Sequence, residues 1–232
     1  MKKVMIPMLA VLTLLVLNSF RMPDLPKEDV RKLETFSGIG IAVSADVYYT
    51  PGNKHEIRIE GDAKDVDALR TEVRDGFLQV KYDSWRVKRS KVTLYISSRE
   101  LEAVKISGSA HFESGEAIST EEMDLAMSGS GGILFEKLEA DEVDVKISGS
   151  GDIEILNGGA DEMSAKISGS GKLNAERFEV NEFSAAISGS GSVRITAKEE
   201  LDVKISGSGK VYYHGNPQVH SVSSGSGKTV AL

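Results

Sequence analysis

The sequence predicts an all-β protein: a parallel β-helix with coils of about 20 residues, preceded by a β-rich cap. The string Ser-Gly-Ser recurs seven times, with its central glycine at Gly108, Gly129, Gly149, Gly169, Gly189, Gly207 and Gly225. Apolar and polar residues alternate around these copies, which is the period of a β-strand. No proline stands between Pro51 and Pro217, as continuous ladders of backbone hydrogen bonds require.

The composition narrows the class of protein further. The chain has 232 residues, of which 40% are hydrophobic and 23 are glycine, enough for one large β domain. It has no cysteine, which excludes disulfide frameworks, thiolate metal sites and cysteine nucleophiles. The formal charge of -7 argues against nucleic acid or anionic lipid as the main partner, because phosphate binding relies on clustered Lys and Arg.

Residues 1–20 are predicted to be a signal peptide. Lys2 and Lys3 precede an apolar run from Val4 to Leu17, which suits a signal sequence and is too short for a membrane-spanning helix. Cleavage is expected near Ser19, and an uncleaved membrane anchor is the alternative. The signal implies secretion across the inner membrane to the periplasm, the outer membrane or the cell surface, with no integral membrane domain after cleavage.

Residues 21–32 are predicted to be an extended linker, and residues 33–100 a β-rich N-terminal part of the head domain. The linker holds two of the five prolines. In the N-terminal part, residues 39–49 and 92–96 alternate as strands do, and a short helix is expected over residues 65–74. This part is expected to cap the solenoid, since terminal coils expose ladder edges.

Residues 101–232 are predicted to form the Ser-Gly repeat β-solenoid. The central glycines follow one another at spacings of 21, 20, 20, 20, 18 and 18 residues. Around Gly149, every second residue from Val145 to Ile153 is apolar or glycine, so these residues are expected to face the inside of the coil. Two of them, Gly149 and Gly151, have no side chain to fill the core, which predicts a corner of the coil at this point. One unit cannot bury its own apolar face and must stack on the next. Right-handed winding is expected, because parallel β crossovers are nearly always right-handed.

The order of these features resembles a known bacterial family. Phe36-Ser37-Gly38-Ile39-Gly40-Ile41 opens the β segment, and recurring Ile-Ser-Gly-Ser-Gly strings follow it. This arrangement, over about residues 33–227, resembles the family called putative auto-transporter adhesin, head GIN domain. The resemblance implies a secreted β-solenoid protein of the cell envelope, of a kind common in Bacteroidetes. It implies no catalytic residues.

The repeat serines are the first candidate for chemistry. Two in each copy, fourteen in all, are expected to form parallel columns of hydroxyls. One interpretation is that these hydroxyls form a polar face that hydrogen-bonds a glycan or a partner. The other, which we favour, is that serine is used because only small residues fit at a tight corner. None stands in a Gly-x-Ser-x-Gly elbow, so a serine hydrolase is not expected. Gly227-Lys228-Thr229 is not a phosphate loop, because Val222 stands where glycine is needed.

An acidic pair precedes most repeat strands. The pairs are Glu121-Glu122, Asp141-Glu142, Asp161-Glu162 and Glu199-Glu200, and in one further copy the place is taken by Asn181-Glu182, with a single acidic residue. Stacked at about 4.8 Å, like charges repel by about 0.9 kcal/mol per neighbour in water. We expect a solvated acidic face, partly offset by the lysines at positions 105, 146, 166 and 204. Ca²⁺ is the alternative, since it takes oxygen ligands, although the Gly-Gly-x-Gly-x-Asp repeat is absent.

Histidine and tryptophan complete the candidates. His55, His111, His214 and His220 share no metal-ligand spacing, and His214 and His220 are expected in a surface turn. Trp85, the only tryptophan, either stacks on a sugar or packs the cap against the solenoid, and we favour packing.

The leading function is therefore a noncatalytic secreted cell-envelope protein, an adhesin or surface-binding scaffold that uses an elongated β-solenoid face. The alternative is a polysaccharide-binding or polysaccharide-cleaving β-helix protein. Cleavage would need paired carboxylates, or Arg and Lys beside Ca²⁺, in a groove built by long loops, whereas the connections here are short. We expect no catalytic, cofactor-binding or metal-ligating residues and no cofactor. The expected partner is a surface glycan or an envelope protein and not nucleic acid, and the sequence indicates no oligomeric state.

Overall fold

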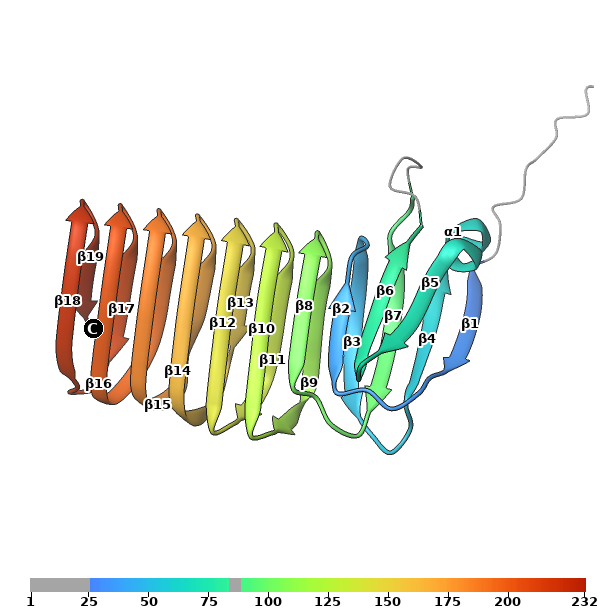
Figure 1. The fold of residues 1–232 in the computed structure, drawn as a ribbon, viewed down its shortest axis with the longest axis horizontal. Helices are drawn as coiled ribbons and strands as arrows, with labels where there is room; N and C mark the ends of the chain where they lie inside the picture. The colour runs from blue at the N-terminus through green and yellow to red at the C-terminus, as the bar shows by residue number, and fades with distance from the viewer. Residues whose placement is uncertain (1–25, 84–88) are drawn as a thin grey trace, which may run out of the picture.

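The computed structural model describes residues 26–83 and 89–232. Its strands form one 19-stranded sheet that winds into an elongated solenoid, with the N-terminal part at one end and the C-terminus at the other (Figure 1). The predicted signal peptide lies outside the described residues. Within those residues, no helix has the length and apolar character to cross a membrane.

The N-terminal part holds eight elements. They are β1 (Lys27–Lys32), β2 (Gly38–Ile41), β3 (Ala45–Pro51), β4 (Glu56–Gly61), α1 (Ala63–Ala68), β5 (Leu69–Arg74), β6 (Phe77–Tyr82) and β7 (Val92–Ser98). The strands that follow are β8 (Ala103–Gly108), β9 (His111–Ser119), β10 (Glu122–Gly129), β11 (Gly132–Glu139), β12 (Glu142–Gly149), β13 (Asp152–Ile155), β14 (Gly158–Gly169), β15 (Lys172–Gly189), β16 (Ser192–Gly207), β17 (Lys210–His214), β18 (Gln218–Gly225) and β19 (Lys228–Ala231).

Successive coils pair in parallel and in register. Strand β12 pairs with β10 on one side and with β14 on the other, so that Gly149 lies opposite both Gly129 and Gly169. The same register continues through β15 and β16 to β18. The repeat strings therefore stand in ladders along the solenoid, which confirms the predicted parallel coils of about 20 residues. The right-handed sense stays a prediction.

Each Ser-Gly-Ser-Gly string turns a corner of the coil. Gly149 has a φ of +118°, a conformation that side chains with a Cβ rarely adopt. Gly151 is buried, and a Cβ there would come within 2.4 Å of Met127 Cγ. The first glycine of each pair therefore supplies the backbone conformation and the second supplies space for the core of the preceding coil. The predicted corner is confirmed.

The core is a stack of apolar rows inside the coils. Val143, Val145 and Ile147 are at most 2% exposed, and their register partners in neighbouring coils are equally buried. Aromatic rings of neighbouring coils also pack against each other: the ring centroids of Phe112 and Phe135 are 5.5 Å apart, with the rings tilted by 45°. Each coil buries its apolar row against its neighbours, because one coil alone cannot enclose a core.

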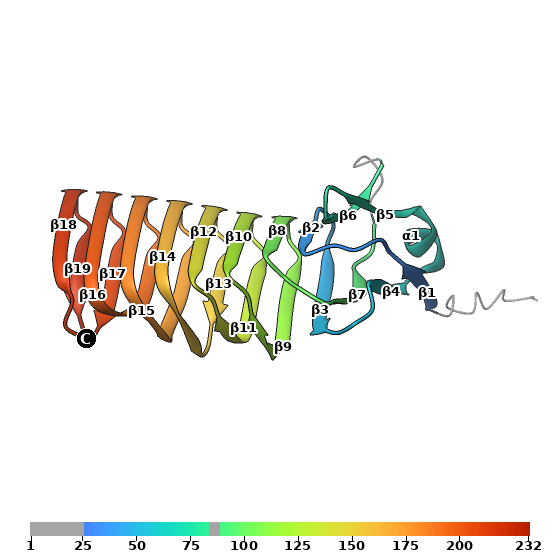
Figure 2. The ribbon, with the colours of Figure 1, turned by 60° about the horizontal axis from the view of Figure 1, so that its bottom comes forward.

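Antiparallel strands close the N-terminal end. The coil of β2 and β3 stacks in parallel on β8 and β9 and, on its other side, on β6 and β7. Strand β4 then pairs antiparallel with β7 and with β1, so the parallel stack ends there (Figure 2). The expected cap is present, and it covers ladder edges that would otherwise be open to other chains.

Two elements of the cap differ from the sequence-based expectation. Residues 27–32 form strand β1 rather than linker, because they pair with β4 and because the Arg31 guanidinium donates hydrogen bonds to the carbonyls of Leu69 and Val66. The predicted helix over residues 65–74 is shorter. It ends at Ala68, because the Asp75-Gly76 turn folds β5 back onto β6 as a hairpin.

Candidate ligand groove

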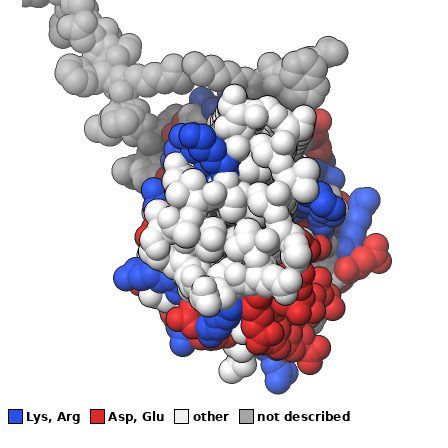
Figure 3. Space-filling model, turned by 90° about the vertical axis from the view of Figure 1, so that its left-hand side faces the viewer, with Lys and Arg blue, Asp and Glu red and all other residues white. Residues whose placement is uncertain are grey.

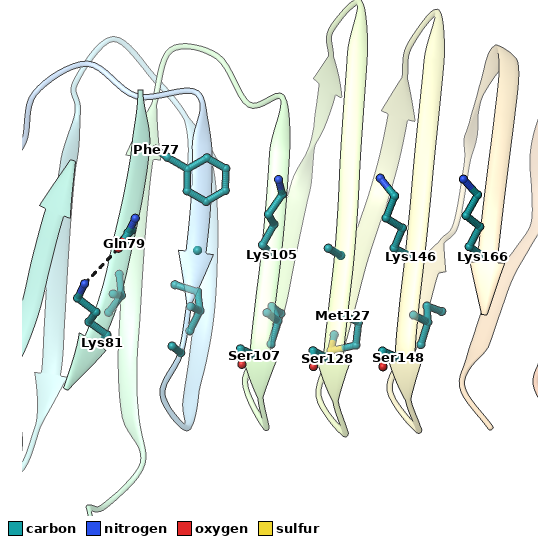
Figure 4. A pocket seen from close by; sticks show the side chains of 17 residues that line it. Phe77, Gln79, Lys81, Lys105, Ser107, Met127, Ser128, Lys146, Ser148 and Lys166 are labelled. Carbon is teal, nitrogen blue, oxygen red and sulfur yellow. Dashed lines mark hydrogen bonds between the residues drawn. The ribbon is translucent and has the colours of Figure 1, made fainter. Parts of the chain in front are cut away.

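A groove of about 500 Å³ lies on the outer face of the sheet, across β6, β2, β8, β10, β12 and β14. It runs across the strands, along the solenoid (Figure 4). This is within the range of cavities that hold small ligands in proteins.

Small residues in one row of the register create the floor. Gly40 on β2 lies opposite Gln79 and Lys105, and Ala126 on β10 lies opposite Lys105 and Lys146. In the neighbouring row, Ala42 follows β2 with an exposed methyl side chain. A glycine and an alanine thus interrupt a row of long side chains. Because the aliphatic stems of lysines cover apolar surface, the gaps become hollows with apolar walls.

An aromatic ring forms one end wall. Phe77 on β6 lies opposite Gly38 on β2. A Cβ at Gly38 would come within 2.3 Å of the ring, and a Cβ at Gly40 within 3.0 Å. The ring is therefore seated on the bare backbone of these two glycines. The ammonium of Lys105 lies 5.1 Å from the centre of the ring, a distance at which the ring attracts a cation.

The charged side chains that line the groove are all lysines. They are Lys81, Lys105, Lys146 and Lys166, and no acidic residue is among the groove-lining residues. Two carboxylates beyond the rim contact two of these lysines: Asp124 lies 2.8 Å from Lys105 Nζ, and Asp144 lies 3.6 Å from Lys146 Nζ. With four lysines and two neighbouring carboxylates, the groove has an excess of positive charge. The net charge of the whole chain, which is -7, does not indicate this local excess.

The repeat serines form the predicted columns. Ser148 lies opposite Ser128 and Ser168, and these residues are exposed. Ser107, Ser128 and Ser148 line one side of the groove. The column is thus both a set of small residues at a corner and, over three coils, one side of the groove.

The acidic column is also confirmed. Glu142, Glu162, Glu182 and Glu200 stand in register, each seven residues before the corner glycine of its coil. Figure 3 shows acidic side chains gathered along one side of the C-terminal end, whose own surface is largely uncharged. Of the four lysines expected to offset this charge, Lys105 and Lys146 form ion pairs with Asp124 and Asp144 and not with the glutamates of the column. In the ranges that the structure describes, no group of three or more His, Asp or Glu is placed to hold a metal ion.

The remaining candidates lie apart from the groove. His214 ends strand β17, where its Nε2 is 3.1 Å from Glu176 Oε1, and His220 lies within β18, so the expectation of a turn was wrong for both. The hydrogen bond with His214, together with the charge of nearby Arg194, lowers the pKa of Glu176. Lys228 begins strand β19 and not a helix. Gly227-Lys228-Thr229 therefore lacks the helix N-terminus that a phosphate loop requires. Trp85 lies outside the described residues.

The residues that sequence reasoning missed are Phe77, Gly40 and Ala126. Their signal was present but indirect. Ala126 interrupts the column of lysines at positions 105, 146 and 166, as Ala186 does further along, and a small residue between long side chains leaves a depression. The seat for Phe77 depends on the pairing of β2 with β6, whose register cannot be read from either strand alone.

The fold defines a class: parallel β-solenoid proteins, here with a groove along one lateral face. A comparison with protein families matches residues 35–217 to the description putative auto-transporter adhesin, head GIN domain. This chain belongs to that family. No curated protein matches it.

Solved structures share the whole fold. A putative adhesin from Bacteroides fragilis is 22% identical with a TM-score of 0.85, and the match covers 90% of this chain and 98% of that one. A putative lipid binding protein from Parabacteroides distasonis is 23% identical with a TM-score of 0.72, covering 90% and 97%. A putative adhesin from Parabacteroides merdae is 20% identical with a TM-score of 0.71, covering 90% and 96%. At these identities the likeness concerns the fold.

Proposed function

We propose that this protein is a noncatalytic binding protein of the bacterial cell envelope, an adhesin or surface-binding scaffold that docks its partner in the groove across β6, β2, β8, β10, β12 and β14. The observation that carries the proposal is the groove itself, because it combines an apolar floor with a rim of lysines. The partner that fits it has an apolar segment and negative charge. A polysaccharide chain, which presents many hydroxyls, matches this lining less well.

The groove also supports a noncatalytic role. Hydrolysis of a glycosidic bond uses a pair of carboxyl groups, one on each side of the bond, and the groove-lining residues include none. The connections between repeat strands are short, as in Leu156 and Asn157 between β13 and β14, and thus build no deep cleft. This combination favours binding over catalysis as the proposed role.

The proposed location is outside the inner membrane. The predicted signal in residues 1–20 would direct export, and family membership is consistent with a secreted or surface protein. The proposed partners are therefore envelope molecules: a surface glycan with apolar or acidic substituents, or an envelope protein. Fractionation of the native cells tests this proposal, and recovery of the protein only in the cytoplasmic fraction would contradict it.

A matched pair of variants tests the docking face. Ala126 and Val222 occupy equivalent positions of the repeat, each three residues before a corner glycine, but only Ala126 lines the groove. Ala126→Phe fills the groove, and Val222→Phe adds the same ring beyond it, opposite Lys204. Beads coated with each protein are incubated with washed cells of the native bacterium, and attached cells are counted. We expect attachment to wild type and Val222→Phe and its loss with Ala126→Phe. Equal attachment to all three, or none to wild type, would refute the proposal.

A further inference from the structure

We infer that the groove binds one molecule of a single-chain anionic amphiphile, a long-chain carboxylate. Its acyl chain lies on the floor at Gly40 and Ala126, and its carboxylate lies at the lysines of the same row. This inference rests on the proposed function of the groove and names the ligand class that the groove takes.

The apolar part of the fit comes from the length and lining of the groove. Six neighbouring strands at a spacing of about 4.8 Å extend over roughly 24 Å, and the groove crosses all six. Along this path a ligand meets the Phe77 ring, the bare backbone at Gly40 and the methyl group of Ala126. An extended acyl chain is a narrow apolar object of comparable length. A sugar ring would leave its hydroxyls facing this surface without partners, at a cost in binding free energy.

The charged part of the fit comes from the lysine row. Three lysines project from one row of the register (Figure 4). Lys146 and Lys166 lie on neighbouring strands, and the strand of Ala126 separates Lys146 from Lys105. Lys105 and Lys146 have aspartate neighbours, whereas Lys166 has no ion pair among the described residues. Lys166 at the end of the groove can therefore take the carboxylate of a ligand without displacing a protein carboxylate.

The charge distribution of the protein favours a single dissolved amphiphile over an anionic membrane surface as the ligand. The formal charge is -7, and Glu142 and Glu162 of the acidic column stand four residues before Lys146 and Lys166 on the same strands. A broad anionic bilayer would meet both charges and be repelled by one of them. A single amphiphile contacts the lysine row alone. The attraction is local, because salt screens charges beyond about 10 Å.

Calorimetric titration of the full exported protein with sodium dodecanoate, below its micelle concentration, tests the ligand class. We expect one site per chain. Acetate, which has the head without the chain, and dodecyltrimethylammonium, which has the chain with the opposite charge, are expected to bind at least about tenfold more weakly. Equal binding of either comparison compound would overturn the inference, as would the absence of dodecanoate binding.

Matched variants place the ligand. Ala126→Phe is expected to weaken dodecanoate binding at least about tenfold, whereas Val222→Phe, in the same column but three strands beyond Lys166, leaves it unchanged. Lys166→Gln is expected to weaken it roughly threefold, and Lys204→Gln, in the same column but outside the groove, is expected to have no effect. Circular dichroism of each variant checks the fold. Equal effects within either pair would contradict the assignment to the groove.

Two further results separate this inference from the proposed function. If dodecanoate does not bind but Ala126→Phe still abolishes cell attachment, the docking face stands and the ligand class is wrong. If vesicles of phosphatidylglycerol bind in a groove-dependent way while dodecanoate does not, a membrane surface is the partner and the single-molecule inference fails. If dodecanoate binds and attachment is insensitive to Ala126→Phe, the groove is a ligand site and the docking role fails.

Discussion

The ring of Phe77 lies on the backbone of Gly38, so closely that a Cβ on this glycine would stand 2.3 Å from Cδ2 of the ring. These two residues are register partners on neighbouring parallel strands. The glycines of the Gly38-Ile39-Gly40 string, which opens the family resemblance, thus have a structural purpose. They seat an aromatic wall of the groove.

This contact predicts the effect of a single methyl group. Gly38→Ala is expected to destabilise the protein by about 1–3 kcal/mol, because the added carbon overpacks the contact with the ring. Phe77→Ala removes the ring, so the same substitution in that background is expected to cost less, with a coupling energy of about 1 kcal/mol or more. Denaturant unfolding of the four proteins of this cycle measures the coupling. Additive losses would show that the ring does not rest on Gly38.

The corner of each coil predicts a strong asymmetry between adjacent residues. Gly169 has a φ of +114°, and a Cβ there would stand 2.5 Å from the carbonyl oxygen of Gly149. Gly169→Val is expected to cost about 3 kcal/mol or more, through backbone strain and this clash. Ser168→Ala removes an exposed hydroxyl and is expected to change stability by less than about 0.5 kcal/mol. Thermal unfolding of both variants compares them, and similar losses would contradict the corner geometry.

Asp65 in the cap predicts a pH dependence. This carboxylate is fully buried, and it accepts hydrogen bonds from the Ser90 backbone N–H at 2.9 Å and from the Arg89 guanidinium at 3.3 Å. Burial acts to raise the pKa of Asp65, but the hydrogen bonds outweigh it and hold the pKa below its ordinary value. A lowered pKa in the folded state means that ionised Asp65 stabilises the fold above the unfolded pKa of about 3.9.

The stabilisation by Asp65 is therefore present at neutral pH and is lost as the pH falls through the folded-state pKa. Asp65→Asn is expected to lower the free energy of unfolding by about 1–3 kcal/mol at pH values near neutrality, and this difference from wild type shrinks below about pH 4. Glu199→Gln, which changes an exposed carboxylate, serves as the control. A difference between wild type and Asp65→Asn that is constant with pH would refute the linkage.

The acidic column predicts a stabilising substitution. Glu162 lies between Glu142 and Glu182 in the register, so Glu162→Gln removes two repulsions and is expected to raise stability by about 0.5–1 kcal/mol at low salt. Added salt should remove this gain in stability.

Melting curves with and without a chelator test the calcium alternative for the acidic column. A melting temperature that falls on chelation, together with destabilisation by Glu162→Gln, would show that the column binds a cation.

The sequence predicted the solenoid because the repeat is local and redundant. Seven copies of one string give the same period, and two glycines in each inward row leave a corner as the economical explanation. The elements of the cap were harder to predict from the sequence. Its strand β1 carries few strand-forming residues and is held by Arg31, whose partners lie in another segment. The hairpin of β5 and β6 had a local signal in Asp75-Gly76, the turn that shortens the helix.

The groove could not be predicted from the repeat, because it arises where the repeat fails. Ala126 replaces lysine in one column, and Gly40 belongs to a strand outside the Ser-Gly strings. Only the register of β2 between β6 and β8 brings these gaps beside Phe77. The net charge of the chain was misleading in the same way, since it averages an acidic column and a basic row that lie on the same strands.

Lysine labelling on cells that carry the bound protein is the measurement that tests the docking face most directly. Acetylation rates are measured by mass spectrometry for the attached and the free protein. We predict that attachment protects Lys105, Lys146 and Lys166 and leaves Lys204 and Lys228 as reactive as before. Protection that is uniform, or that falls on Lys204 and Lys228 while the groove lysines stay reactive, would contradict the account.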